Sequence, residues 1–170
     1  MVARSIFLLR LTKPGYATTT FLFGPISGTV NLTREEAVPP GMVPVPDDES
    51  DLGYPLNEAP VVKLDDFLID RYEVTNEEYQ KFVDAGGYRE QKYWKQPFVR
   101  EGRTLPWEES IALFRDSTGR PGPATWEVGA FPKGQEKHPV AGVSWFEAAA
   151  YAEFAGKSLP TAYHWTLAAQ

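Results

Sequence analysis

The sequence of 170 residues contains no cysteine. Disulfide bonds, thiolate metal sites and cysteine nucleophiles are therefore excluded for these residues. Only two histidines are present, so a histidine-based metal centre would lack a third nitrogen ligand. The sequence gives no thiol or imidazole cluster on which redox or metal chemistry could be built.

The sequence also lacks a long apolar segment and a basic cluster. No stretch approaches the ~18 consecutive apolar residues of a membrane-spanning helix. The net charge is −6, from 17 basic and 23 acidic residues, which indicates that nucleic acid is not a partner. The first eleven residues hold a short apolar run that Arg10 interrupts, and no small-residue cleavage site follows. We interpret this run as a strand rather than a signal peptide.

Glycine, proline and aromatic residues are abundant. The 14 glycines and 15 prolines predict a large share of irregular loops. Aromatic residues make up 14% of the chain, which is enough apolar surface for a folded core. A chain of this length is typical of one domain, since domains run to roughly 100–200 residues. We therefore expect one loop-rich domain.

The strand candidates lie in the first seventy residues. Residues 5–23 predict a β-hairpin, because a Pro-Gly turn joins an apolar run to a run rich in threonine and aromatics. We assign residues 1–24 to this hairpin and residues 25–40 to a linker. Two further strands are predicted over residues 42–45 and 61–64.

An acidic segment at residues 47–51 lies between the last two strand candidates. It lacks the fixed ligand spacing and the terminal glutamate of an EF-hand calcium loop. We favour a solvated loop here and keep a calcium site as the alternative.

Capping chemistry predicts the helix starts. Thr75 and Glu78 form a T-x-x-E capping box, and Ser144 and Glu147 repeat the pattern. Thr161 predicts a third helix start, although the position three residues later is not acidic. A weaker helix is expected over residues 106–114, with a proline in its first turn.

Five segments in this order, over residues 41–169, resemble one family. They are G-M-V-P-V-P at 41–46, F-L-I-D-R-Y-E-V-T-N at 67–76, H-P-V-A-G-V-S-W at 138–145, A-A-A-Y-A at 148–152 and G-K-S-L-P-T at 156–161. They are similar to the signatures of the formylglycine-generating-enzyme (sulfatase-modifying-factor) superfamily. The resemblance gives structural motif roles to the following residues: Asp70, Glu73, Thr75, Asn76, Glu78, His138, Ser144, Trp145, Glu147 and Thr161.

The resemblance implies an α+β, C-type-lectin-like fold that is loop-rich and, in this chain, incomplete at the C-terminus. Residues 41–170 would form the N-terminal part of that domain. In the full family the domain is a copper-dependent oxidase that converts a protein cysteine to formylglycine. Its copper-binding cysteines and most of its calcium sites lie in the later part of the domain. The resemblance therefore carries no catalytic, cofactor-binding or metal residue onto this chain, and copper and calcium are expected only in the complete domain.

A finer resemblance concerns a branch fused to bacterial Ser/Thr protein kinases. The segments A-G-G-Y at 85–88 and W-E-V-G at 126–129 look like that branch, and R-L-T-K-P-G-Y at 10–16 resembles the end of a PEGA-like module. This implies a fused kinase as a partner, and a location in the cytoplasm or tethered to a membrane-linked kinase. One departure is that Ala162, Tyr163, His164 and Thr166 replace or flank glutamates of the family pattern L-P-T-E-A-E-W-E.

Polar residues of the motifs have structural and chemical interpretations. For His138 we favour a structural role over metal binding, because matched ligands are absent. For Asp70 and Glu73 we favour hydrogen bonding of a strand-to-helix turn over general acid–base work. Ser144 and Thr161 are expected to be caps rather than nucleophiles, since no base stands beside them.

The sequence has five tryptophans. Trp145 and Trp165 begin helices, and we expect both in the core. Trp94 and Trp126 lie in loops, where an exposed ring could line a peptide or ligand groove. Burial of these two rings in the core is the favoured alternative.

Two functions stay open. In the first, the complete domain is an oxidase of a substrate thiol. In the second, the domain is a non-catalytic module whose loops, within residues 88–137, bind a protein or peptide ligand for an attached kinase. An unrelated β-rich scaffold is a third reading. Catalysis by these 170 residues alone is not expected, because part of a constellation cannot position a substrate.

Overall fold

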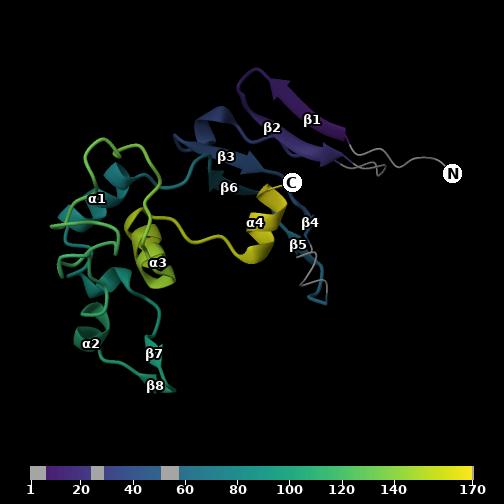
Figure 1. The fold of residues 1–170 in the computed structure, drawn as a ribbon. Helices are drawn as coiled ribbons and strands as arrows, with labels where there is room; N and C mark the ends of the chain where they lie inside the picture. Colours follow the sequence, from purple (N-terminus) through teal and green to yellow (C-terminus); the bar gives the residue numbers. More distant parts are fainter. Residues whose placement is uncertain (1–6, 24–28, 51–57, 170) are drawn as a thin grey trace. The chain divides into compact units, whose positions relative to one another are not determined.

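The computed structural model describes residues 7–23, 29–50 and 58–169. The chain divides into two units (Figure 1). The first unit comprises Met1–Tyr72 with Pro160–Gln170, and the second comprises Glu73–Leu159. Each unit is described by itself.

The first unit begins with the predicted β-hairpin. Strands β1 (Phe7–Lys13) and β2 (Tyr16–Phe23) pair antiparallel, with Lys13 opposite Tyr16 at the turn. Gly15 takes φ +77° there, a conformation that glycine adopts without strain. The hairpin prediction is confirmed; its assignment to a PEGA-like module stays a prediction.

The described part of the expected linker returns to the hairpin. The amide of Ala17 donates to the Thr33 carbonyl at 2.9 Å, and the amide of Glu35 donates to the Gly15 carbonyl at 3.1 Å. A short 3-10 helix, η1 (Glu35–Ala37), follows. Residues 33–35 thus bond to the turn and to the start of β2, and the assignment of residues 25–40 to a linker stays a prediction.

Two further strand pairs complete the first unit. Strand β3 (Met42–Val45) pairs antiparallel with β6 (Phe67–Asp70), and β4 (Asp48–Ser50) pairs with β5 (Val62–Leu64). The solvated loop expected at residues 47–51 is thus partly wrong. Pairing with β5 makes Asp48–Ser50 a strand, Asp47 precedes it without regular structure, and residue 51 lies outside the described residues.

Helix α4 (Ala162–Ala168) packs on the pair of strands β4 and β5. The Tyr163 hydroxyl donates to the Pro60 carbonyl at 2.8 Å. The His164 ring meets Phe67 edge to face, with ring centroids 4.7 Å apart. The predicted cap is present, because the Thr161 hydroxyl accepts from the His164 amide.

The second unit is built from short helices and loops. Its helices are α1 (Asn76–Asp84), α2 (Trp107–Ile111) and α3 (Trp145–Phe154), with a 3-10 helix, η2 (Gln91–Tyr93). A small hairpin joins β7 (Val99–Arg100) to β8 (Arg103–Thr104). Helix α3 contacts both α1 and η2 (Figure 1).

Both predicted capping boxes are present in this unit. At α1 the Thr75 hydroxyl accepts from the Glu78 amide, and the Glu78 carboxylate accepts from the Thr75 amide. At α3, Ser144 and Glu147 make the same reciprocal pair. Helix α2 is shorter than expected, because after Ile111 the amides bond three residues back rather than four.

The core of the second unit is aromatic. Its buried members are Tyr79, Phe82, Tyr88, Trp94, Phe98, Trp126 and Ala150. Gly87 is required beside Phe82, because a Cβ atom on Gly87 would lie 2.1 Å from the Phe82 ring. The glycine pair after α1 therefore ends the helix and also makes room for a core ring. Taken together, the described residues combine strands and helices, as the α+β expectation requires.

Candidate functional site

A buried asparagine at the start of α1 ties three segments of the second unit together. The Asn76 Nδ2 donates to the Gln135 carbonyl at 2.9 Å, and its Oδ1 accepts from the Trp126 indole at 3.1 Å. Its backbone amide donates to the His138 carbonyl at 2.9 Å. The side chain of Asn76 is thus committed to structure, and it fixes the loop that carries His138.

A buried polar chain links α1, the loop after it and α3. The Tyr88 hydroxyl donates to Glu147 Oε1 at 2.6 Å and lies 3.1 Å from the Tyr79 hydroxyl. Glu147 Oε2 accepts from the Ser144 amide at 2.7 Å. Burial raises the pKa of both tyrosines, which keeps their hydroxyls protonated. Glu147 is only 3% exposed, so this network is a packing device with no access for a substrate.

A second buried carboxylate organises the loops of residues 116–130. Asp116 Oδ1 accepts from the amides of Thr118 and Arg120 and from the Thr118 hydroxyl, at 2.8–2.9 Å. Its Oδ2 accepts from the Gly129 amide at 2.7 Å. Desolvation favours the protonated acid, but these four donors outweigh it and lower the pKa of Asp116 to about 2. Asp116 is therefore an ionised, fully bonded anchor.

The two loop tryptophans have different places. Trp126 is 1% exposed and packs edge to face on Tyr79 and Phe131. Its burial leaves no ring face for a ligand. Trp94 is 7% exposed, donates to the Gly87 carbonyl at 2.8 Å and lines a pocket.

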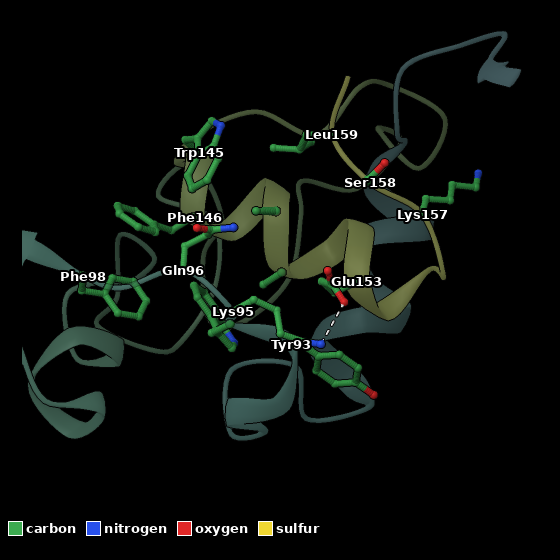
Figure 2. Close-up of a pocket in the computed structure, with 13 residues that line it drawn as sticks. Tyr93, Lys95, Gln96, Phe98, Trp145, Phe146, Glu153, Lys157, Ser158 and Leu159 are labelled. Atoms are coloured by element: carbon green, nitrogen blue, oxygen red, sulfur yellow. Dashed lines mark ion pairs between the residues drawn. The ribbon is translucent and has the colours of Figure 1, made fainter. Parts of the chain in front are cut away.

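The pocket lies between α3 and the segment of residues 93–98 (Figure 2). Its volume is about 200 Å³. Its aromatic lining residues are Tyr93, Trp94, Phe98, Trp145 and Phe146, and the others are Lys95, Gln96, Ala149, Ala150, Glu153, Lys157, Ser158 and Leu159. An ion pair joins Lys95 to Glu153 at 3.5 Å. This pocket is the candidate binding site of the second unit.

Trp145 and Trp165 differ from expectation. Trp145 is 57% exposed and Trp165 is 62% exposed, so the expectation that both rings are core residues is wrong. Trp145 is the first residue of α3, and Trp165 is the central residue of α4. The residues that α3 buries are Glu147, Ala150 and Ala152, and the one that α4 buries is Leu167. The periodicity of each helix thus turns these rings outward.

The family suggested by the motifs is matched by a known family model. Residues 28–170 match the model of the family described as the sulfatase-modifying factor enzyme 1-like domain. The chain belongs to this family. The match begins inside the segment assigned to the linker and covers every capping box, the Asp116 anchor and the pocket.

Similar proteins of this family carry three different names. A formylglycine-generating enzyme of Thermomonospora curvata is 35% identical over 147 residues, which cover 79% of this chain and 48% of that protein. A hercynine oxygenase of Mycobacterium tuberculosis is 40% identical over 115 residues, 64% of this chain and 25% of that protein. Serine/threonine-protein kinase pkn1 of Chlamydia pneumoniae is 34% identical over 117 residues, 66% of this chain and 16% of that protein. This chain thus spans about half, or less, of the curated relatives it matches.

Several residues of the family motifs make hydrogen bonds inside the fold. Ser144, Thr75 and Thr161 cap helices, and Asn76 and Glu147 bond inside the fold as given above. His138 is exposed, and its backbone carbonyl and amide are the groups that bond. Asp70 lies in β6 opposite Met42, and Glu73 is exposed at the start of the second unit.

Across residues 7–23, 29–50 and 58–169, no three acidic, histidine or cysteine side chains are placed to hold a metal ion. In the same ranges, no helix is both long and apolar enough to cross a membrane.

Sequence reasoning missed three features of the second unit, namely the Asp116 anchor, the Tyr88–Glu147 bond and the pocket. A local signal existed for the first, because an aspartate two residues before a threonine is typical of an Asx turn. Ala149 and Ala150 both line the pocket, and Ala150 is fully buried.

Proposed function

We propose that this chain is the scaffold-forming part of a sulfatase-modifying-factor-type protein that oxidises a cysteine of a polypeptide substrate to formylglycine. The observation that carries the proposal is the family match over residues 28–170. The formylglycine-generating enzyme of Thermomonospora curvata, 35% identical over 79% of this chain, supports the reaction. For the complete domain we propose the C-type-lectin-like arrangement implied by the motifs.

Copper does not fit the residues present, and within residues 7–23, 29–50 and 58–169 no cluster of acidic side chains is placed to hold calcium. Copper(I) prefers soft thiolate ligands, and the sequence contains no cysteine. The buried carboxylates Asp116 and Glu147 already accept four and two hydrogen bonds from the protein. In this proposal any copper or calcium is held by residues beyond these 170, and no step of the oxidation is assigned to the residues described.

In this proposal, these 170 residues provide a rigid surface against which the substrate is positioned. Asn76, Asp116 and Glu147 each tie together segments that are far apart in sequence. Positioning of this kind lowers the entropic cost of bringing a substrate to a reacting group.

The test uses the protein expressed from its complete coding sequence. It is loaded with copper(I), supplied with oxygen and a thiol reductant and mixed with a cysteine peptide, and the aldehyde product is detected by hydrazide labelling and mass spectrometry. One oxygen atom enters the aldehyde and the cysteine sulfur leaves as sulfide, while the reductant supplies the two electrons that convert the other oxygen atom to water. We expect aldehyde from the complete protein and none from the 170-residue chain. No aldehyde from the copper-loaded complete protein would overturn the oxidase proposal. Aldehyde from the 170 residues alone would overturn the scaffold role.

A second candidate function is a ligand-binding module attached to a kinase. Two relatives favour it, the pkn1 kinases of Chlamydia pneumoniae and Chlamydia caviae, which are 34% and 30% identical over 117 residues each. In this case the complete coding sequence would encode a kinase domain and no cysteine pair. Sequencing that coding region separates the two functions, because a thiolate copper site requires the pair.

A further inference from the structure

The pocket beside α3 exists because small residues face large ones. Ala149 and Ala150 project no side chain beyond Cβ, so they leave a hollow in the surface of the helix. Aromatic rings stand around it, and Phe98 and Phe146 pack with centroids 4.7 Å apart. Trp145 stands at the side of the hollow with its ring largely exposed (Figure 2).

The size of the hollow selects for a single ring. Its volume is about 200 Å³, and an apolar cavity of about 150 Å³ is known to admit benzene. One phenyl, phenol or indole group therefore fits. An incoming ring would meet aromatic neighbours, with which edge-to-face contacts are favourable beyond simple burial.

The polar part of the lining indicates what carries the ring. Lys95 and Glu153 form an ion pair at 3.5 Å, and their side chains remain 60% and 43% exposed. Figure 2 shows this pair on one side of the hollow and the Gln96 amide near its centre. An ammonium has three donors and a carboxylate several acceptor positions, so both retain free bonding capacity. The lining also includes Lys157 and the Gln96 amide. The pocket thus offers both donors and acceptors, which the C=O and N–H groups of a peptide backbone can use.

We propose that this pocket binds one aromatic side chain of a polypeptide segment, whose backbone bonds to Lys95, Gln96 and Glu153. The proposal applies to the pocket alone and does not depend on oxidase activity. It therefore holds for a substrate polypeptide and for the ligand of a kinase-linked module alike.

The experiment is an NMR titration of the isotope-labelled 170-residue chain. The probes are N-acetyl-tryptophanamide, N-acetyl-phenylalaninamide and, as the aliphatic control, N-acetyl-leucinamide. We expect amide shifts concentrated in residues 93–98 and 145–153. We also expect binding of the aromatic amides to be about fivefold tighter than that of the leucine amide. Equal affinities, or shifts spread outside these segments, would overturn the proposal without any variant.

A matched pair of variants locates the binding. Ala149→Leu fills the hollow, and Ala155→Leu adds the same side chain at the exposed end of α3, outside the pocket. We expect Ala149→Leu to weaken binding of the tryptophan amide at least about tenfold and Ala155→Leu to leave it unchanged. Circular dichroism and the thermal midpoint verify that each variant is folded. Equal binding by the two folded variants would contradict the proposal.

A second copy of the chain is the competing occupant, and sedimentation equilibrium tests it. Concentration-dependent dimers that Ala149→Leu abolishes would identify the pocket as a self-association site and overturn the proposal. A monomer at all concentrations supports the polypeptide ligand.

Discussion

The first turns of α1 and α3 contain the same capping box in two different environments. At α1 the box is made by Thr75 and Glu78 and lies at the surface. At α3 it is made by Ser144 and Glu147, where the carboxylate is buried and also accepts from the Tyr88 hydroxyl. A capping box needs only two residues that are three positions apart. The stability lost when the box is removed also depends on whether its carboxylate bonds to a distant residue, as Glu147 does to Tyr88.

The largest effect is expected for Glu147→Ala. This change leaves the Tyr88 hydroxyl and the Ser144 amide without their acceptor and opens a cavity. We expect the free energy of unfolding to fall by about 3 kcal/mol, measured by urea denaturation at pH 7. Glu147→Gln, a change of similar volume, serves as the control. It should lower the free energy of unfolding by less than Glu147→Ala does. A loss below about 1 kcal/mol for Glu147→Ala would show that the buried box is no more important than an exposed one.

Glu78→Ala tests the exposed box by the same measurement. Only the local bonds to the Thr75 amide and hydroxyl are lost. We expect a loss of about 1 kcal/mol, which is typical of a helix cap. Thr75→Ala should cost a similar amount. If Glu78→Ala and Glu147→Ala lowered the free energy of unfolding by the same amount, the two boxes would not differ in importance.

Acid titration separates the exposed box from the Asp116 anchor. Hydrogen bonds from the hydroxyl and then the amide of Thr75 lower the pKa of Glu78 below its ordinary 4.5, and the pKa of Asp116 falls from 3.8 to about 2. Because both folded-state values are depressed, each carboxylate stabilises the fold above its ordinary pKa. That stabilisation is lost as the pH falls through the lower, folded value.

We therefore expect the free energy of unfolding to fall between about pH 4.5 and pH 2. Glu78→Gln should flatten the upper part of this profile, and Asp116→Asn the lower part. Urea unfolding at half-unit pH steps measures both slopes. Profiles of the two variants that run parallel to the unmodified chain would contradict the assigned shifts.

The smallest effect is expected for His164→Glu, which restores the family carboxylate at α4. From sequence alone this change should stabilise the helix. In the structure, however, the His164 Nδ1 already lies 2.6 Å from the Thr161 hydroxyl, and the ring packs on Phe67. We expect a net change within about 0.5 kcal/mol. A clear gain in thermal midpoint would show that the imidazole is a poor substitute for the carboxylate.

The parts of the fold that the sequence predicted are those set by near neighbours. The Pro14-Gly15 turn, the two capping boxes and the cap at Thr161 need residues only one to three positions apart. The family motifs extended this to domain membership, because five weak signals in one order are specific.

The rest depended on contacts between distant residues. Tyr88 reaches Glu147 across 59 positions, and Asn76 reaches Trp126 across 50. The outward direction of Trp145 and the hollow above Ala149 follow from which helix face meets the aromatic core. Helix periodicity tells which residues share a face but not which face meets the core, so the pocket could be found only in three dimensions.

The Asp116 anchor has a consequence for a region that contains neither helix nor strand over residues 117–144. Its carboxylate holds the amides of Thr118, Arg120 and Gly129 as a ladder would hold them in a sheet. These three amides should exchange with deuterium as slowly as those of a helix, and proteases should leave the loop uncut until the whole unit opens. The ionised carboxylate of Asp116 thus orders an irregular loop by bonding its backbone amides, as regular secondary structure does elsewhere.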